Sequence, residues 1–151
     1  MIAIYDTFPG ADVTIGQNQF AIGKATGELG GKYLVEHFGG KGDVMVLTAD
    51  SLGGATIDRS RGIIAGLKAV APEAKIVANV DAYATAKAEN AVSTALQAHP
   101  DIRLVATINT AGAEGALSAL QNAGKKTPQD ASVVPAFGEA TLSTLQEVKK
   151  G

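Results

Sequence analysis

Apolar residues occur in two patterns that alternate along the chain, short uninterrupted runs and longer stretches with a helical repeat. These runs, which are mostly continuous and do not alternate with polar residues, predict strands at residues 2–5, 43–48, 74–80, 103–108 and 131–137, with a weaker candidate at 12–17. Successive side chains of a strand point to opposite sides of a sheet, so a strand that is apolar throughout is covered on both faces. The runs therefore predict a parallel sheet with helices on both faces.

Between the runs, apolar residues recur every three or four positions, which is the spacing of one helix face. This spacing predicts helices at residues 19–37, 56–70, 85–98, 112–123 and 141–149. Glycines in "FGGKG" and "NAGKK" follow the first and fourth of these, and glycine there can end a helix in the left-handed conformation. Strands that alternate with helices form right-handed βαβ units. We therefore expect a single α/β lobe over residues 1–151, with three layers (α/β/α) and a mostly parallel, doubly wound sheet.

Composition and charge exclude several classes of function but add little to the predicted fold. A chain of 151 residues can bury a core of its own. Its net charge of −2 gives no basic excess to neutralise phosphates, so we expect no nucleic-acid partner for this chain. Cysteine is absent, no spacing of His, Asp and Glu suggests a metal site, and we expect no cofactor. The opening "MIAIY" is too short for a signal peptide or a membrane span.

Polar and aromatic residues follow each predicted strand, which is where ligands bind in open α/β sheets. They are Asp6, Asp50, Ser51, Asp81, Tyr83, Asn109, Thr110 and Glu139, with Arg59 and Arg61 on a following helix. Planar polar side chains make paired hydrogen bonds, and an aromatic ring can cover the apolar face of a sugar. From this set we predict ligand contacts for Asp6, Arg61, Tyr83, Asn109 and Glu139; Asp81 fits a turn or helix-capping role equally well.

The stretch "DRSRG" at residues 58–62 sets two arginines in the opening turns of a predicted helix, whose positive end favours acids. Asp58 fits that preference and is expected to cap the helix. The two arginines lie about 200° apart around the helix, so they face different ways. We predict that Arg61 points over the sheet edge, that Gly62 leaves room behind it, and that Arg59 is a solvated charge.

These residues do not form a recognisable catalytic arrangement. The histidines, His37 and His99, fall at predicted helix ends on the opposite edge of the sheet, so no Ser/His/Asp set is available. Asp6 and Glu139 would suit a sugar-modifying enzyme if they lay roughly 5–10 Å apart, but nothing in the sequence brings them together. We therefore expect a binding protein and no enzymatic activity.

Three segments resemble the type I periplasmic sugar-binding proteins of the ribose-binding kind. They are "YLVEHFGGKGDVMVLTADSLGGATIDRSRGIIAGLKA", "DAYATAKAENAVSTALQAHPDIRLVATINTAGAEGALSALQNAG" and "SVVPAF", and the resemblance covers the whole chain. It implies a Rossmann-like lobe of a non-catalytic, two-lobed receptor that closes on a sugar. It also implies delivery of the sugar to the membrane permease of an ABC transporter, and hence a periplasmic or extracytoplasmic location.

The resemblance also implies roles for single residues. Asp6 corresponds to the family's acid after the hinge strand, Arg61 to its arginine before a glycine, and Tyr83 to its aromatic after the next strand. Asn109 corresponds to the family's asparagine, although Thr110 and Ala111 replace the usual Asp-Glu. Thr7 stands where ribose-type members carry an arginine, and Gly138, with Glu139 beside it, stands where they carry an aspartate. Ribose itself is therefore not implied.

The resemblance extends only to the second lobe and the hinge strand that leads into it. We therefore expect a domain fragment whose first lobe is absent, with "MIAIY" as the hinge strand. Half of a cleft makes half of the hydrogen bonds, so we predict weak or undetectable sugar binding by this chain alone. The apolar edge left by a missing lobe also favours self-association.

A second family shares this fold, the lactose-repressor-type transcription regulators. The segment "KKTPQDASVVPAF" is similar to their effector-sensing domain, and such a protein would be cytoplasmic. The segment "HFGGKGDVMVL" favours the transport receptors instead, because regulators tend to carry a basic turn at that point.

Overall fold

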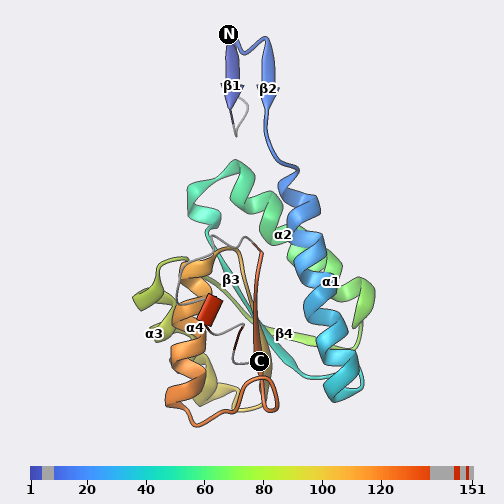
Figure 1. Cartoon of the computed structure of the whole chain (residues 1–151), viewed down its shortest axis with the longest axis vertical. Helices are drawn as coiled ribbons and strands as arrows, with labels where there is room; N and C mark the ends of the chain where they lie inside the picture. The colour runs from blue at the N-terminus through green and yellow to red at the C-terminus, as the bar shows by residue number, and fades with distance from the viewer. Residues whose placement is uncertain (5–8, 137–144, 147–148, 150–151) are drawn as a thin grey trace.

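A four-stranded parallel sheet forms the middle layer of the protein, which we describe from a computed structural model (Figure 1). The structure describes residues 1–4, 9–136, 145–146 and 149. The sheet has the order β4-β3-β5-β6 and consists of β3 (Asp43–Thr48), β4 (Lys75–Asp81), β5 (Ile102–Thr107) and β6 (Ser132–Pro135). All neighbouring pairs are parallel, as the uninterrupted apolar runs predict.

Two helices cover each face of this sheet. One face carries α1 (Gln19–Phe38) and α2 (Gly54–Val70), and the other carries α3 (Thr85–Ala98) and α4 (Thr110–Asn122) (Figure 1). A short 3-10 helix, η1 (Asp50–Leu52), joins β3 to α2. The expected three-layer α/β/α arrangement with a parallel sheet is confirmed.

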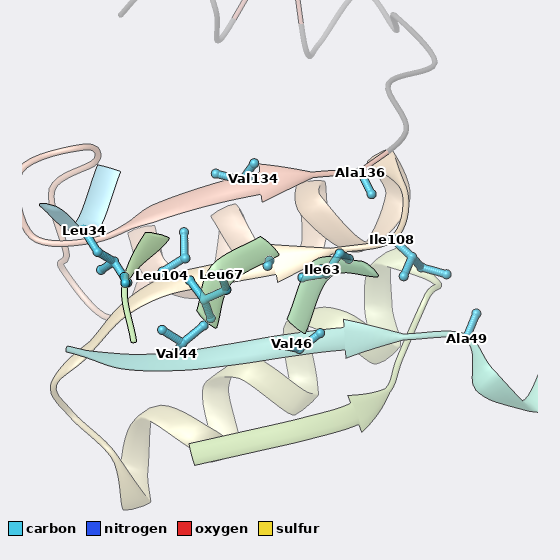
Figure 2. Close-up of a cluster of buried hydrophobic side chains, with 12 residues drawn as sticks. Leu34, Val44, Val46, Ala49, Ile63, Leu67, Leu104, Ile108, Val134 and Ala136 are labelled. Carbon is cyan, nitrogen blue, oxygen red and sulfur yellow. The ribbon is translucent and has the colours of Figure 1, made fainter. Parts of the chain in front are cut away.

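The strands divide the core into two halves because alternate side chains face alternate layers. Val44 and Val46 of β3 pack with Ile63 of α2 in the cluster drawn in Figure 2. Met45 and Leu47, which alternate with these valines along β3, pack against α3 and α4 in a second cluster. The central strand β3 therefore needs apolar residues at successive positions, which is why its apolar run from Val44 to Leu47 is continuous.

Helices α1 and α2 approach each other so closely that only glycine fits between them. A Cβ atom added to Gly23 would lie 2.0 Å from the carbonyl oxygen of Arg59, and one added to Gly66 would lie 2.0 Å from that of Lys24. Glycine inside a helix costs about 1 kcal/mol relative to alanine, so its repeated use here reflects the close approach of the two backbones.

The helix limits agree with the predicted ones to within one residue except at two starts. Helix α2 begins at Gly54 instead of residue 56, and α4 begins at Thr110 instead of residue 112. Gly39 ends α1 in the left-handed conformation, with φ of 63°, as "FGGKG" predicts. The predicted helix at 141–149 and the end of the strand at 131–137 fall largely outside the described residues. Among the described helices, none combines the length and the apolar character needed to cross a membrane.

The first two strands form a small sheet of their own. Strand β1 (Ile2–Ile4) pairs in parallel with β2 (Val13–Ile15), and this pair projects from the end of the molecule beyond α1 and α2 (Figure 1). The side chains of Ile2, Val13 and Ile15 are exposed. Parallel sheets are normally covered on both faces, and an isolated two-stranded sheet is marginally stable in water. The pair therefore lacks the apolar cover that such strands require.

Candidate functional site

The carboxyl ends of the four sheet strands share one edge of the molecule. Figure 2 shows Ala49, Ile108 and Ala136 at the arrowhead ends of β3, β5 and β6, and the chain leaves the sheet there. The polar residues that follow these strands surround the same edge, which we call the carboxyl edge. In parallel α/β sheets this edge is where ligands bind.

Asn109 joins the end of β5 to the segment that follows β4. Its Oδ1 accepts a hydrogen bond from the amide of Gly112 (2.9 Å) and so caps α4, and its Nδ2 donates to the carbonyl oxygen of Tyr83 (3.0 Å). Each end of a side-chain amide has capacity for one further hydrogen bond. Asn109 is therefore fixed in position and can still meet a ligand.

Tyr83 lies beside Asn109 at the carboxyl edge. Its side chain is half-buried and packs against the core cluster that contains Ile108. The structure thus brings two of the predicted site residues together through the Asn109–Tyr83 hydrogen bond. Their contact with a ligand stays a prediction.

Arg59, which we predicted to be solvated, is buried, so that prediction is wrong. The residue is only 8% exposed. Its Nε donates to Oε1 of Gln19 (3.0 Å), its Nη2 donates to the same oxygen, and its Nη1 donates to the carbonyl oxygen of Ile108 (3.0 Å). The guanidinium of Arg59 therefore lies at the carboxyl edge, bound to the carbonyl oxygen of the residue that precedes Asn109.

Arg61 lies on the other side of α2. Its side chain is 72% exposed, and its Nη1 is 3.9 Å from Oδ1 of Asp58, three residues earlier. Asp58 does not cap the helix as predicted, because α2 begins four residues before it with Gly53 at the cap position. Across the part of the chain that the structure describes, no hydrogen bond or ion pair joins Arg61 to the carboxyl edge, and its ligand contact stays a prediction.

Gly62 does not make room for Arg61, contrary to our expectation. A Cβ atom at position 62 would lie 2.2 Å from the carbonyl oxygen of Phe20, so α1 occupies that space. Gly62 and Gly66 lie within about 60° of Arg59 around the helix and about 100–140° from Arg61. The face of α2 that meets α1 therefore carries Arg59. The spacing of these glycines is a sequence signal that identifies the inward arginine.

Polar residues after β3 and β4 form a second set of hydrogen bonds at this edge. The amide of Ser51 donates to Oδ2 of Asp81 (2.7 Å), and the Ser60 hydroxyl donates to Oδ1 of Asp50 (2.8 Å). The hydrogen bonds from Ser51, and then the nearby Lys87 ammonium, hold the pKa of Asp81 below its usual value. Asp81 is thus a carboxylate at neutral pH and fixes the start of η1, in line with the turn role considered for it.

Two buried side-chain atoms of the described residues lack a hydrogen-bond partner, and both belong to the carboxyl edge. They are Nε2 of Gln19, a residue that is 6% exposed, and Oδ1 of Asp81, which lies 3.9 Å from the Lys87 ammonium. Folded proteins rarely leave such atoms unpaired, because each costs about 1–3 kcal/mol. The carboxyl edge thus holds one donor and one acceptor that a ligand or water would satisfy.

Other candidate residues fall outside this network. Asp6 and Glu139 lie outside the described residues, so their predicted ligand roles and their possible pairing as carboxylates stay untested. His99 follows α3 and lies 3.9 Å from Asp43 at the start of β3, which confirms that it occupies the opposite edge. No group of three or more metal-ligating side chains comes together among the residues that the structure describes.

Several solved structures that resemble this chain are sugar-binding proteins about twice as long as it is. One is an ABC transporter periplasmic solute-binding protein from Actinobacillus succinogenes, solved with bound D-allose. It is 25% identical to this chain with a TM-score of 0.78, and the match covers 99% of this chain and 53% of that protein. The myo-inositol-binding protein of Caulobacter, with bound myo-inositol, is 24% identical with a TM-score of 0.80 (99% and 50%). An arabinose-binding protein of Geobacillus stearothermophilus is 18% identical with a TM-score of 0.80 (99% and 49%). The chain therefore spans about half the length of the structures it matches.

Sequence comparison gives the same assignment at the level of the family. No curated protein matches the chain significantly. The family model described as "Periplasmic binding protein domain" matches residues 2–151, and this match covers nearly the whole chain. The members of this family are binding proteins, and the observed fold is that of one of their lobes. The chain belongs to the periplasmic binding protein domain family.

Proposed function

We propose that this chain is a non-catalytic sugar-binding lobe whose carboxyl edge forms one half of a sugar site. One observation carries the proposal: two buried atoms without a hydrogen-bond partner, Gln19 Nε2 and Asp81 Oδ1, lie at the edge that also holds Arg59 and Asn109. A sugar hydroxyl both donates and accepts hydrogen bonds, so it suits an edge where one donor and one acceptor still have hydrogen-bonding capacity. Tyr83 supplies an aromatic ring for the apolar face of the sugar.

The second half of the site belongs, in this proposal, to a first lobe. The length of the relatives supports it, since each is about twice as long as this chain. The uncovered β1–β2 pair supports it as well, because a sheet in a first lobe would cover Ile2, Val13 and Ile15. The complete protein is then a two-lobed receptor that delivers a sugar to a membrane permease, and it acts outside the cytoplasm.

The half-site sets a limit on affinity. A micromolar dissociation constant corresponds to about 8 kcal/mol and a millimolar one to about 4 kcal/mol. A single lobe makes only part of the hydrogen bonds and leaves the sugar in contact with water, so we expect this chain alone to bind sugars at millimolar strength or more weakly.

Calorimetric titration of the chain with D-allose, D-arabinose and myo-inositol tests this proposal. The expected result is millimolar or weaker binding of at least one of them. A micromolar dissociation constant for any sugar would contradict the half-site and indicate a complete site. Hydrolysis or modification of a sugar during the titration would contradict the non-catalytic role.

A further inference from the structure

Gln19 is a buried polar residue at the carboxyl edge that was not among the predicted ligand contacts. It is the first residue of α1, follows the capping residue Asn18, and is almost fully buried at the carboxyl edge. Its Oε1 accepts hydrogen bonds from both Nε and Nη2 of Arg59. An exposed polar residue would suffice to begin a helix, so the burial of Gln19 points to another role.

The contact with Arg59 fixes which way the amide of Gln19 is turned. A guanidinium only donates hydrogen bonds, so the oxygen of the amide must face it and the nitrogen must point away. The nitrogen, Nε2, is buried and has no partner. Turning the amide over would set two donors against each other, so the structure cannot satisfy Nε2 that way.

The close packing of α1 and α2 holds this pair together. Gly23 is one turn after Gln19 on α1, and a Cβ atom on Gly23 would lie 2.0 Å from the carbonyl oxygen of Arg59. The two backbones therefore touch next to the Gln19–Arg59 hydrogen bonds. Because the helices cannot move closer or rotate freely at this point, the amide is positioned before any ligand arrives, which lowers the cost of binding.

We propose that Gln19 is a sugar-contacting residue that does two things: its Oε1 orients Arg59, and its Nε2 donates a hydrogen bond to an oxygen of the bound sugar. This inference rests on the proposed function, because it names a further contact in the same site. The ligand atom that Nε2 meets is an acceptor, since a donor there would leave both groups unpaired.

Nuclear magnetic resonance of the side chains tests the two roles separately. The Nε–H signal of Arg59 reports its hydrogen bond to Gln19, and the Nε2 proton signals of Gln19 report a new partner. Gln19→Glu keeps an oxygen for Arg59 and removes the Nε2 donor, whereas Gln19→Leu removes both. Gln17→Leu, at an exposed neighbouring position, is the matched control.

We expect D-allose in large excess to shift the Nε2 signals of Gln19 in the wild-type chain. The Arg59 Nε–H signal should persist in Gln19→Glu and in the control and disappear in Gln19→Leu. Both Gln19 variants should bind D-allose about tenfold more weakly than the control, the loss expected for one buried hydrogen bond. If Gln19→Leu does not fold, Gln19→Glu, which has nearly the same shape, still gives the decisive comparison.

Other outcomes would overturn the inference in distinguishable ways. If D-allose shifts the amides of Asn109 and Gly112 but not Nε2 of Gln19, the sugar site stands and the role of Gln19 in it is wrong. If Gln19→Glu binds as the control does and only Gln19→Leu is weaker, Gln19 acts through Arg59 alone and the Nε2 contact is wrong. If none of D-allose, D-arabinose and myo-inositol shifts any signal at the carboxyl edge, the proposed function fails and the inference fails with it.

Discussion

A Cβ atom at position 27 would lie 2.0 Å from the carbonyl oxygen of Ile63, so Gly27 of α1 rests directly on the backbone of α2. The same relationship occurs one turn earlier, between Gly23 and Arg59. These contacts set the distance between the two helices and thereby the position of Arg59 relative to Gln19. Helix packing on one face of the sheet and the arrangement of the carboxyl edge are therefore linked.

Gly27→Ala should destabilise the protein strongly. The added methyl group meets backbone atoms that cannot move without separating α1 from α2, so we expect a loss of about 3 kcal/mol or more in the free energy of unfolding. Gly30→Ala is the matched control, because the added methyl there meets only the end of the Leu104 side chain, at 2.7 Å. Urea denaturation of both variants checks this, and equal losses would contradict backbone contact as the cause.

Replacing Arg59 or Arg61 by methionine, one at a time, should show which of the two arginines the sugar response needs. Arg59→Met removes the donors to Gln19 and to the Ile108 carbonyl, so we expect the shifts that D-allose causes at the carboxyl edge to disappear. Arg61→Met removes an exposed charge whose ion pair with Asp58 is worth at most about 0.5 kcal/mol, so sugar response and stability should stay close to wild type. Titrations of the two variants, followed by amide signals, make the comparison. A reversed outcome would support the prediction from the sequence that Arg61 is the sugar-binding arginine.

Tyr33 should make the protein sensitive to alkali. Burial raises the pKa of Tyr33 from 10.0 to about 12, and its hydroxyl donates to the carbonyl oxygen of Pro128 (2.6 Å). A raised pKa in the folded state means that this stabilisation is complete below pH 10 and is lost as the pH rises toward 12. Absorbance titration should find one tyrosine ionising near pH 12, and this step should be missing in Tyr33→Phe. Ionisation of Tyr33 already near pH 10 in the folded protein would contradict the burial.

Asp81 should contribute to stability in the opposite pH range. Hydrogen bonds from Ser51 lower the pKa of Asp81 below 3.8, so its contribution is present above that pH and is lost as the pH falls through the lowered value. In Asp81→Asn, the free energy of unfolding should therefore change less between neutral and acid pH than in the wild type. Asp101→Asn, at an exposed position, is the control for the loss of one charge. An acid dependence in Asp81→Asn that equals that of the control would contradict the role of the Ser51 contact.

The sequence pattern predicted the α/β fold well, because strands covered on both faces are mostly apolar and do not alternate with polar residues. The runs at 43–48 and 103–108 coincide with β3 and β5 to within one residue. The same reasoning placed Asn109 and Tyr83 at one edge, since the strand ends alone determine that position. The β1–β2 pair was predicted as two strands, but their pairing apart from the main sheet depends on contacts that a strand pattern does not encode.

The expectations that Arg59 is solvated and that Gly62 leaves free space were wrong, because both depend on how α1 packs against α2. Arg59 and Arg61 are equally polar, and only the position of the neighbouring helix decides which one is buried. That position is set by glycines, and one of them, Gly62, which we interpreted as free space, is in fact a point of backbone contact. Gln19 was missed for a related reason, because a glutamine at the start of a helix gives no sign that α2 buries it.

Mapping of a weakly bound sugar onto the wild-type chain tests the central claim most directly. D-allose would be added in increasing amounts while the backbone amide signals are recorded. We predict saturable shifts at the carboxyl edge, around Ser51, Tyr83, Asn109 and Gly112, with no change around Gly42 and Lys75 at the opposite edge. Saturable shifts confined to the opposite edge, or no saturable shift with D-allose, D-arabinose or myo-inositol, would contradict a sugar half-site at the carboxyl edge.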